Sequence, residues 1–191
     1  MYNGLTVGFA MTGSFCTFKK VIPEIDNLSK KGANVLPIMS NTAATTDTRF
    51  GKAEDFVNTL EKITGNPVIT TIAEAEPIGP KKLLDILIVA PCTGNSLAKL
   101  ANGIADTAVT LAVKSHLRNK RPVVLGISSN DSLGANAKNI GLLLSRKNIY
   151  MIPFGQDDCI EKENSIVAHF DQTEDTMCMA LEGNQIQPML I

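Results

Sequence analysis

The amino-acid sequence predicts an α/β fold in which a doubly wound parallel sheet lies between two layers of helices. Apolar runs of strand length alternate with segments of helical periodicity along most of the chain, as in proteins built from βαβ units. Polar loops follow three of these runs, at the positions where parallel sheets bind ligands. A chain of 191 residues with 44% hydrophobic content can bury one good core and is short for two. We therefore expect a single domain over residues 1–191, a Rossmann- or flavodoxin-like three-layer sandwich with its core in residues 5–155 and a C-terminal helix and tail in residues 156–191.

The first half of the chain predicts two strand and helix units. Its expected order is a strand at 5–10, a helix at 14–31, a strand at 34–39, a helix at 52–64, a short strand at 68–70 and a loop at 72–80. The first helix is supported by a shared apolar face of Phe15, Phe18, Ile22, Ile25 and Leu28. Gly32 is typical of a helix end, and Pro23 should kink the helix because it lacks an N–H.

The second half repeats the alternation. We expect a strand at 83–89, a helix carrying Leu97, Leu100, Ala101 and Ile104, a helix at 107–117, a strand at 122–127, a helix at 133–147 and a strand at 149–152. The tail from Gln156 is more polar, with a helix predicted at 172–181 and a loosely held end at 185–191.

Composition excludes several classes of partner. The 18 basic and 19 acidic residues give a net charge of −1, and no basic cluster stands out beyond residues 118–121, so we expect no nucleic-acid partner. The four cysteines (Cys16, Cys92, Cys159 and Cys178) lack CxxC spacing and no signal peptide precedes them, which argues against a zinc site and a disulfide framework. No apolar run approaches the ~20 residues of a membrane span. These features predict a cytoplasmic protein with reduced thiols, no membrane partner and no metal.

The loop after the strand at 83–89 carries the most informative motif. Thr93, Asn95 and Ser96 stand between that strand and a helix, where backbone N–H groups and short polar side chains can face an anion or a flat polar ring. An equally simple interpretation is that Asn95 or Ser96 only caps the helix.

The loop after the first strand indicates a mononucleotide. Gly8 and Gly13 have P-loop spacing, but Ser14 and Phe15 replace the required Lys and Ser/Thr, which excludes triphosphate hydrolysis. The dinucleotide pattern is also absent, and Ser40 stands where an acid should bind ribose. What remains is a loop that can hold one phosphate through the amides of Gly13 and Ser14 and the hydroxyls of Thr12 and Ser14, which suits FMN better than NAD. The alternative is a plain turn with a helix cap.

Three segments together resemble a known family. They are Pro91-Cys92-Thr93-Gly94-Asn95-Ser96 with the Leu-Ala-Lys-Leu-Ala-Asn-Gly-Ile-Ala-Asp run after it, Thr12-Gly13-Ser14, and Ser40-Asn41-Thr42-Ala43. Their order and register are similar to those of the homo-oligomeric flavin-containing Cys decarboxylase-like flavoproteins, over roughly residues 5–155. The resemblance implies FMN, with Thr12, Gly13, Ser14, Ser40 and Thr42 on the phosphate and ribityl side and Thr93, Gly94, Asn95 and Ser96 along the ring and chain. It also implies a site completed by a neighbouring subunit, hence a trimer or a multiple of it.

Two departures from the family pattern bear on the chemistry. Ser128 falls where some relatives place an arginine against the phosphate, and its short neutral side chain would weaken flavin binding. The decarboxylating relatives carry a histidine soon after the second strand, whereas residues 41–51 contain none. The resemblance implies that Asn95 still holds a substrate carboxylate. The chain would then keep carboxylate recognition but lack the decarboxylating base.

Each of the remaining polar or reactive side chains can be interpreted either as a functional group or as an ordinary surface or packing residue. Arg49 and Asn130 are plausible carboxylate anchors, although a loop arginine is more often solvated. His116 and His169 are interpreted as packing or surface histidines rather than bases. Cys92 precedes a helix start, where a thiol pKa can fall, but we favour a small packing residue.

Over its whole length the chain is similar to a narrower branch of this family. That branch supplies the flavoprotein-like subunit of a two-component oxidoreductase that makes dipicolinate, an aromatic pyridine dicarboxylate, in the mother cell of a sporulating bacterium. The resemblance implies a cyclic dicarboxylate substrate and a partner subunit that binds NADP or NAD. Two alternatives stay open: an FMN-dependent decarboxylase of an acidic substrate, and a non-catalytic scaffold that activates its partner.

Overall fold

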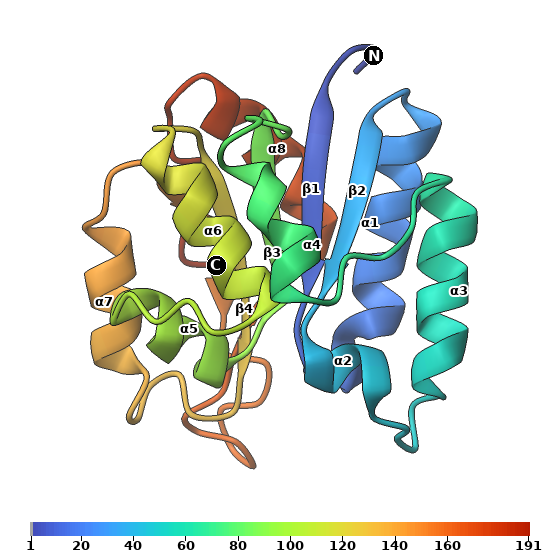
Figure 1. The fold of residues 1–191 in the computed structure, drawn as a ribbon. Coiled ribbons are helices and arrows are strands. Elements are labelled where there is room, and N and C mark those ends of the chain that lie inside the picture. Colours follow the sequence, from blue (N-terminus) through green and yellow to red (C-terminus); the bar gives the residue numbers. More distant parts are fainter. Residues whose placement is uncertain (1) are drawn as a thin grey trace.

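A computed structural model describes residues 2–191 (Figure 1). Its elements follow in the order β1 (Thr6–Met11), α1 (Phe18–Lys30), β2 (Asn34–Met39), α2 (Asn41–Thr45), α3 (Ala53–Thr64), α4 (Ile72–Ala75), β3 (Ile86–Cys92), α5 (Gly94–Ala101), α6 (Ala108–Arg118), β4 (Val123–Ser129), α7 (Ala137–Leu144), β5 (Ile149–Met151), β6 (Phe154–Gly155), β7 (Ile166–Ala168) and α8 (Thr173–Leu181). Single 3₁₀ turns lie at Phe15–Thr17, Glu76–Ile78 and Phe170–Gln172. No helix within residues 2–191 is long and apolar enough to span a bilayer.

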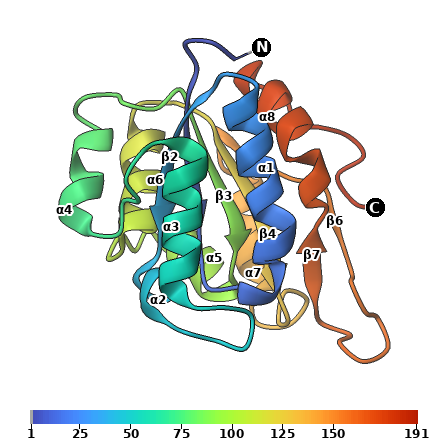
Figure 2. The same ribbon diagram turned by 90° about the vertical axis from the view of Figure 1, so that its right-hand side faces the viewer.

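The sheet confirms the predicted fold class. Its strand order is β2-β1-β3-β4-β7-β6, with β5 also paired to β4. The strands β2, β1, β3, β4 and β5 are parallel, which is the flavodoxin-like order, and β7 runs antiparallel to the end of β4. Figure 2 shows α1, α3 and α8 on one face of the sheet and α4 and α6 on the other. The chain thus changes face between β1 and β3, so the loops after these two strands diverge and leave a crevice.

The core lies along the central strands. All seven residues of β3 are buried, as are Val7, Phe9 and Met11 of β1. Strands covered by helices on both faces have continuous apolar runs, which is why the sequence showed these strands clearly. Phe18 of α1 packs edge-on against Phe56 of α3, with ring centroids 4.9 Å apart.

Several short elements differ from the sequence predictions. The first helix starts at Phe18 rather than Ser14, after a 3₁₀ turn, and it continues through Pro23. The predicted loop at 72–80 contains α4, because Thr71 and Glu74 form a capping box. The helix expected at 133–147 is limited to α7, and Ile104 lies beyond the end of α5 with 47% of its surface exposed. Residues 68–70 make only one parallel bridge, between Ile69 and Ile38.

The tail departs most from prediction. It contains the antiparallel pair β6 and β7, and its last residues are tied down rather than loosely held. The Gln185 side chain accepts from the Met151 N–H at 2.7 Å and donates to the Met151 carbonyl at 2.8 Å. The Phe154 N–H donates to the Met189 carbonyl at 3.0 Å. The prediction of a loose end was wrong because a polar composition does not reveal backbone pairing.

A polar cluster joins the two ends of the described chain. Tyr2 Oη donates to Glu174 Oε1 at 2.6 Å and lies 3.2 Å from Cys178 Sγ, while Asn27 and Lys31 of the α1 end bind Glu174 Oε2 at 2.7 and 2.5 Å. These hydrogen bonds, led by that from Lys31, lower the pKa of Glu174, and burial raises the pKa of Tyr2. The cluster fastens α8 to β1 and α1.

Candidate functional site

Two adjoining hollows lie at the carboxyl ends of β1, β3 and β4. The larger has a volume of about 660 Å³ and the smaller about 290 Å³, and both are lined by Gly13 and Thr93. They mark the point where the chain changes face of the sheet, which is where open α/β sheets bind ligands.

The smaller hollow gathers residues from three loops that the sequence singled out. Its lining comprises Thr12, Gly13, Ser40, Asn41, Thr42, Thr93, Asn95, Ser96, Lys99 and Thr107. The one cation in that lining is Lys99, and its ammonium pairs with Asp106 at 2.8 Å. The hollow is therefore rich in neutral hydroxyls and amides.

The larger hollow contains the other predicted residues together with cations that the sequence did not reveal. Ser14 Oγ and Ser128 Oγ lie 2.7 Å apart across it. Lys20, Arg49 and Lys162 also line it, and within residues 2–191 only Lys162 faces a carboxylate, that of Asp157, at 3.6 Å. Lys20 stands on α1 just beyond the first loop, so its place could have been inferred from the helix. Lys162 could not, because the sequence does not show how the segment between β6 and β7 folds back.

Thr12 and Thr93 hold the two loops in register. The buried Thr12 hydroxyl donates to the Pro91 carbonyl at 2.7 Å and accepts from the Thr93 N–H at 3.0 Å. The Thr12 hydroxyl thus links the end of β1 to the end of β3. Thr93 Oγ1 accepts from the Ser96 N–H at 3.3 Å, which makes Thr93 the N-cap of α5. The alternative in which Asn95 or Ser96 is the cap was wrong.

Asn95 consequently has a free side chain. It is exposed on the first turn of α5, lines the smaller hollow, and makes no side-chain hydrogen bond within residues 2–191. Ser40 differs, because its hydroxyl caps α2 by accepting from the Ala43 N–H at 3.2 Å. Asn95 shares this freedom with Asn41 and Thr42, which are exposed at the same hollow and make no side-chain hydrogen bond within residues 2–191.

Backbone donors complete the site. The N–H groups of Gly13, Gly94 and Asn95 have no acceptor among the described residues, and all three residues line the hollows. Gly94 is closely packed: a Cβ there would lie 2.6 Å from Asn136 Nδ2 and 2.7 Å from Ser129 Oγ, so a larger residue would displace these side chains. Unpaired N–H groups at a helix start, beside hydroxyls, bind phosphate and polar ring edges. The donor set therefore fits a flavin mononucleotide.

The other reactive side chains have structural roles. His116 is buried on α6, its Nε2 lies 3.1 Å from the Pro122 carbonyl, and burial lowers its pKa to about 4. Burial also raises the pKa of the Cys92 thiol to about 12, so the neutral thiol persists at physiological pH. His169 is exposed and lines a third hollow, which adjoins the larger one through Lys20, Asp157 and Val167, while Arg49 lies over Phe50 at 4.9 Å. Neither the larger nor the smaller hollow is lined by a histidine, and residues 2–191 contain no cluster of three or more potential metal ligands.

A family model described as Flavoprotein matches residues 1–179. The chain belongs to the flavoprotein family. The resemblance predicted from the three loops is confirmed by a 48% identity over 189 residues to the B subunit of dipicolinate synthase from Bacillus subtilis (strain 168), covering 99% of this chain and 94% of the relative.

Solved structures of flavoproteins agree with this assignment. The crystal structure of the dipicolinate synthase B subunit from Bacillus halodurans superposes with a TM-score of 0.92 at 46% identity, covering 100% of this chain and 97% of that one. The FMN-dependent cysteine decarboxylase TvaF from thioviridamide biosynthesis is 25% identical, with a TM-score of 0.59, over 75% of this chain and 86% of that one. The family thus includes flavin-dependent enzymes, and FMN is the cofactor named for such a relative.

Proposed function

We propose that this chain is the flavoprotein subunit of a dipicolinate synthase and acts with a nicotinamide-binding partner, the A subunit of dipicolinate synthase. The observation that carries the proposal is the 48% identity to a dipicolinate synthase B subunit along nearly the whole of both chains. The reaction is the oxidation of a cyclic dicarboxylate to an aromatic pyridine. A dihydro precursor loses a hydride and a proton, and a hydroxytetrahydro precursor also loses water. The setting we propose is the mother-cell cytoplasm of a sporulating bacterium.

The flavin site is assigned to the two hollows. The N–H groups of Gly13, Gly94 and Asn95 and the paired hydroxyls of Ser14 and Ser128 would hold FMN. Bound FMN supplies an acceptor for a hydride. NADP or NAD on the partner is the alternative hydride acceptor. The two acceptors predict different cofactor requirements for pyridine formation.

The chain's own residues bind and orient the substrate. The Asn95 amide can donate to a carboxylate while its carbonyl accepts from a ring N–H. Arg49, Asn130 and Lys20 line the larger hollow, where a guanidinium or ammonium compensates the charge of a dianion. By resemblance, we propose that a neighbouring subunit completes this site in a trimer or a multiple of it.

A second candidate function is FMN-dependent decarboxylation. The likeness to a cysteine decarboxylase favours it. The absence of a histidine from the lining of both hollows argues against it, because the family's base is missing. A third candidate is a scaffold that activates its partner without binding substrate.

Reconstitution distinguishes these functions. The chain is purified with its partner, and pyridine formation is followed by absorbance with and without added FMN. Activity that needs both subunits and FMN supports the proposal with the flavin as acceptor. Activity that needs both subunits and NADP or NAD alone assigns the acceptor to the partner. Pyridine formation by the partner alone, at the rate of the pair, would overturn the proposal.

A further inference from the structure

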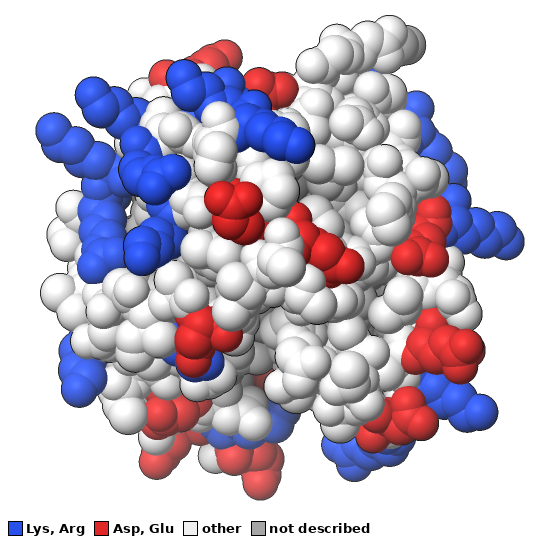
Figure 3. All heavy atoms as spheres, viewed as in Figure 1, with Lys and Arg blue, Asp and Glu red and all other residues white. Residues whose placement is uncertain are grey.

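Charge is unevenly distributed along this nearly neutral chain. Residues 107–156 contain seven Lys or Arg and one carboxylate, Asp131, whereas residues 157–191 contain eight carboxylates and one Lys, Lys162. Figure 3 shows basic side chains gathered on the side of the molecule formed by α6 and α7. The excess of cations thus lies on α6, α7 and the segments beside them, and the excess of carboxylates lies in residues 157–191.

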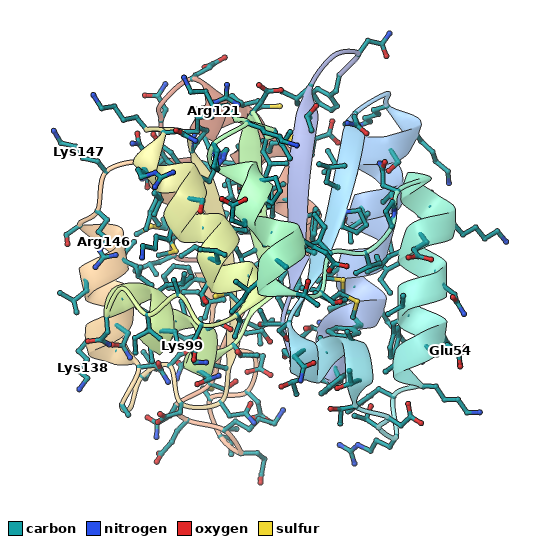
Figure 4. The ribbon with its side chains drawn as sticks, in the orientation of Figure 1. Glu54, Lys99, Arg121, Lys138, Arg146 and Lys147 are labelled. Atoms are coloured by element: carbon teal, nitrogen blue, oxygen red, sulfur yellow. The ribbon has the colours of Figure 1, made fainter. Side chains whose placement is uncertain are left out.

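The basic surface surrounds an apolar hole. We call Lys114, Arg118, Arg146 and Lys147 the basic face; none of them makes an ion pair within residues 2–191. Arg146 and Lys147 lie at the α7 end of this face (Figure 4). The hole, of about 210 Å³, lies between the end of α5, α6 and Arg146 just beyond α7. We call it the α6–α7 pocket, and its lining includes Leu100, Ile104, Val113 and Leu117.

The rim of this pocket is held in place. The Arg146 guanidinium donates to the Leu100 carbonyl at 3.0 Å and to the Ala101 carbonyl at 2.7 Å, at the carboxyl end of α5. A cation at that end of a helix is favourable for the helix dipole. Arg146 is thus fixed beside the apolar hole, while Lys114 lines the hole from α6.

The C-terminal segment includes a projecting turn that carries carboxylates and has an exposed apolar residue at its tip. Residues 158–163, which we call the acidic tip, join β6 to β7 and extend beyond the sheet in Figure 2. Asp158 Oδ1 accepts from the N–H groups of Ile160 at 3.2 Å and Glu161 at 2.9 Å, and the Lys162 N–H donates to the Asp158 carbonyl at 3.0 Å. Ile160 is 84% exposed, the most exposed of the large hydrophobic side chains in the described chain.

We propose that the acidic tip of one copy docks into the α6–α7 pocket of a second copy, with Ile160 in the apolar hole and Glu161 and Glu163 against the basic face. Two features of the chain support a second copy as the occupant. The ordered turn holds Ile160 outward, and this side chain matches the apolar pocket. The carboxylates of Glu161 and Glu163 make no ion pair within residues 2–191, and neither do the cations of the basic face. Because the turn is already formed, docking loses little conformational entropy. The contact is heterologous, so each copy gives one tip and accepts another; such contacts form a ring when the rotation between copies closes and a filament when it does not.

Sedimentation velocity of the full-length protein tests the apolar part of the contact. Ile160→Asn should raise the dissociation constant for self-association by about 10- to 100-fold, a loss of one buried apolar anchor. The matched control is Ile72→Asn on α4, which removes an isoleucine that is 48% exposed and belongs neither to the acidic tip nor to the lining of the α6–α7 pocket. Far-UV circular dichroism verifies that both variants fold. Wild-type protein that stays monomeric at 100 μM, or an Ile160→Asn variant that associates like wild type, would overturn the proposal.

A charge exchange tests the pairing of the two surfaces. K114E/K147E and E161K/E163K should each weaken self-association, and an equimolar mixture of the two should regain it, because each then offers the charge that the other lacks. Raised salt should weaken the wild-type contact. No recovery on mixing contradicts the pairing. Normal self-association with lost binding of the partner subunit would assign these surfaces to the partner and overturn the proposal.

Discussion

Ser14 and Ser128, which are 114 positions apart in the chain, meet with their hydroxyl oxygens 2.7 Å apart at the ends of β1 and β4. One hydroxyl donates to the other, so the pair can still offer one O–H and oxygen lone pairs to a ligand. In the flavin site proposed above, this pair would give the phosphate hydrogen bonds and no charge of its own, while Lys20 and Arg49 line the same hollow.

The first prediction is that Ser14→Asp abolishes FMN binding. A carboxylate placed beside Ser128 would face the phosphate in a partly desolvated hollow, which costs several kcal/mol. Quenching of flavin fluorescence measures binding, and the wild-type protein should bind FMN more tightly than FAD or NAD. Ser145→Asp, at an exposed position after α7, is the control. Wild-type protein that binds NAD and ignores FMN would disprove the assignment.

The second prediction separates the roles of Asn95 and Thr93. Asn95→Ala should lower pyridine formation by the reconstituted pair about a hundredfold, the usual scale for losing a polar contact that orients substrate. Its fold should be unaffected, because the Asn95 side chain makes no hydrogen bond within residues 2–191. Thr93→Ala should instead lower the free energy of unfolding by about 1 kcal/mol or more, since it removes the α5 cap. Full activity of Asn95→Ala, with activity lost on disrupting the partner contact, would favour the scaffold.

The third prediction is that the protein is not a decarboxylase of cysteine conjugates. Incubation with phosphopantothenoylcysteine should release no carbon dioxide above background, because no histidine lines either hollow. A phosphopantothenoylcysteine decarboxylase serves as the positive control. Robust release would mean that another group replaces the base, and His116 is a poor candidate since it is buried on α6.

The fourth prediction concerns pH and His116. Burial lowers its pKa from 6.5 to about 4 in the folded protein. The unfolded chain therefore binds a proton at higher pH than the folded chain, so the contribution to stability is complete above pH 6.5 and is lost as the pH falls toward 4. The loss is on the order of 3 kcal/mol.

Thermal unfolding between pH 7 and pH 4 measures this effect. His116→Gln should reduce the pH dependence, because glutamine keeps an N–H for the Pro122 carbonyl without taking up a proton. His169→Gln changes the exposed histidine and is the control. Equal pH dependence of wild type and His116→Gln would show that other groups account for acid destabilisation.

The long elements were predictable because their periodicity arises directly from burial. Strand β3 is covered on both sides and shows an uninterrupted apolar run, and α1 displays an apolar face every three or four residues. The five-residue helix α2 and the three-residue strand β7 are too short for any period to develop. Their existence depends on a cap at Ser40 and on pairing with β4, which are tertiary facts.

The site was predictable where it lies on strand ends and not where distant segments fold back. Thr12, Ser40 and Thr93 follow strands that neighbour each other, so they share the smaller hollow. The sequence did not show that the hydroxyl of Thr12 is taken up by Pro91 and Thr93. Nor did it place Lys162, which reaches the larger hollow from a segment 149 positions beyond Gly13.

The contact between Tyr2 and Glu174 has a consequence for synthesis on the ribosome. The two residues are 172 positions apart, so β1 and β2 can emerge and pair long before α8 exists. Until α8 leaves the exit tunnel, Asn27 and Lys31 lack their carboxylate and part of the α1 side of the sheet stays uncovered. The nascent chain therefore depends on its final helix to close this face, and its exposed apolar surface is open to aggregation until then.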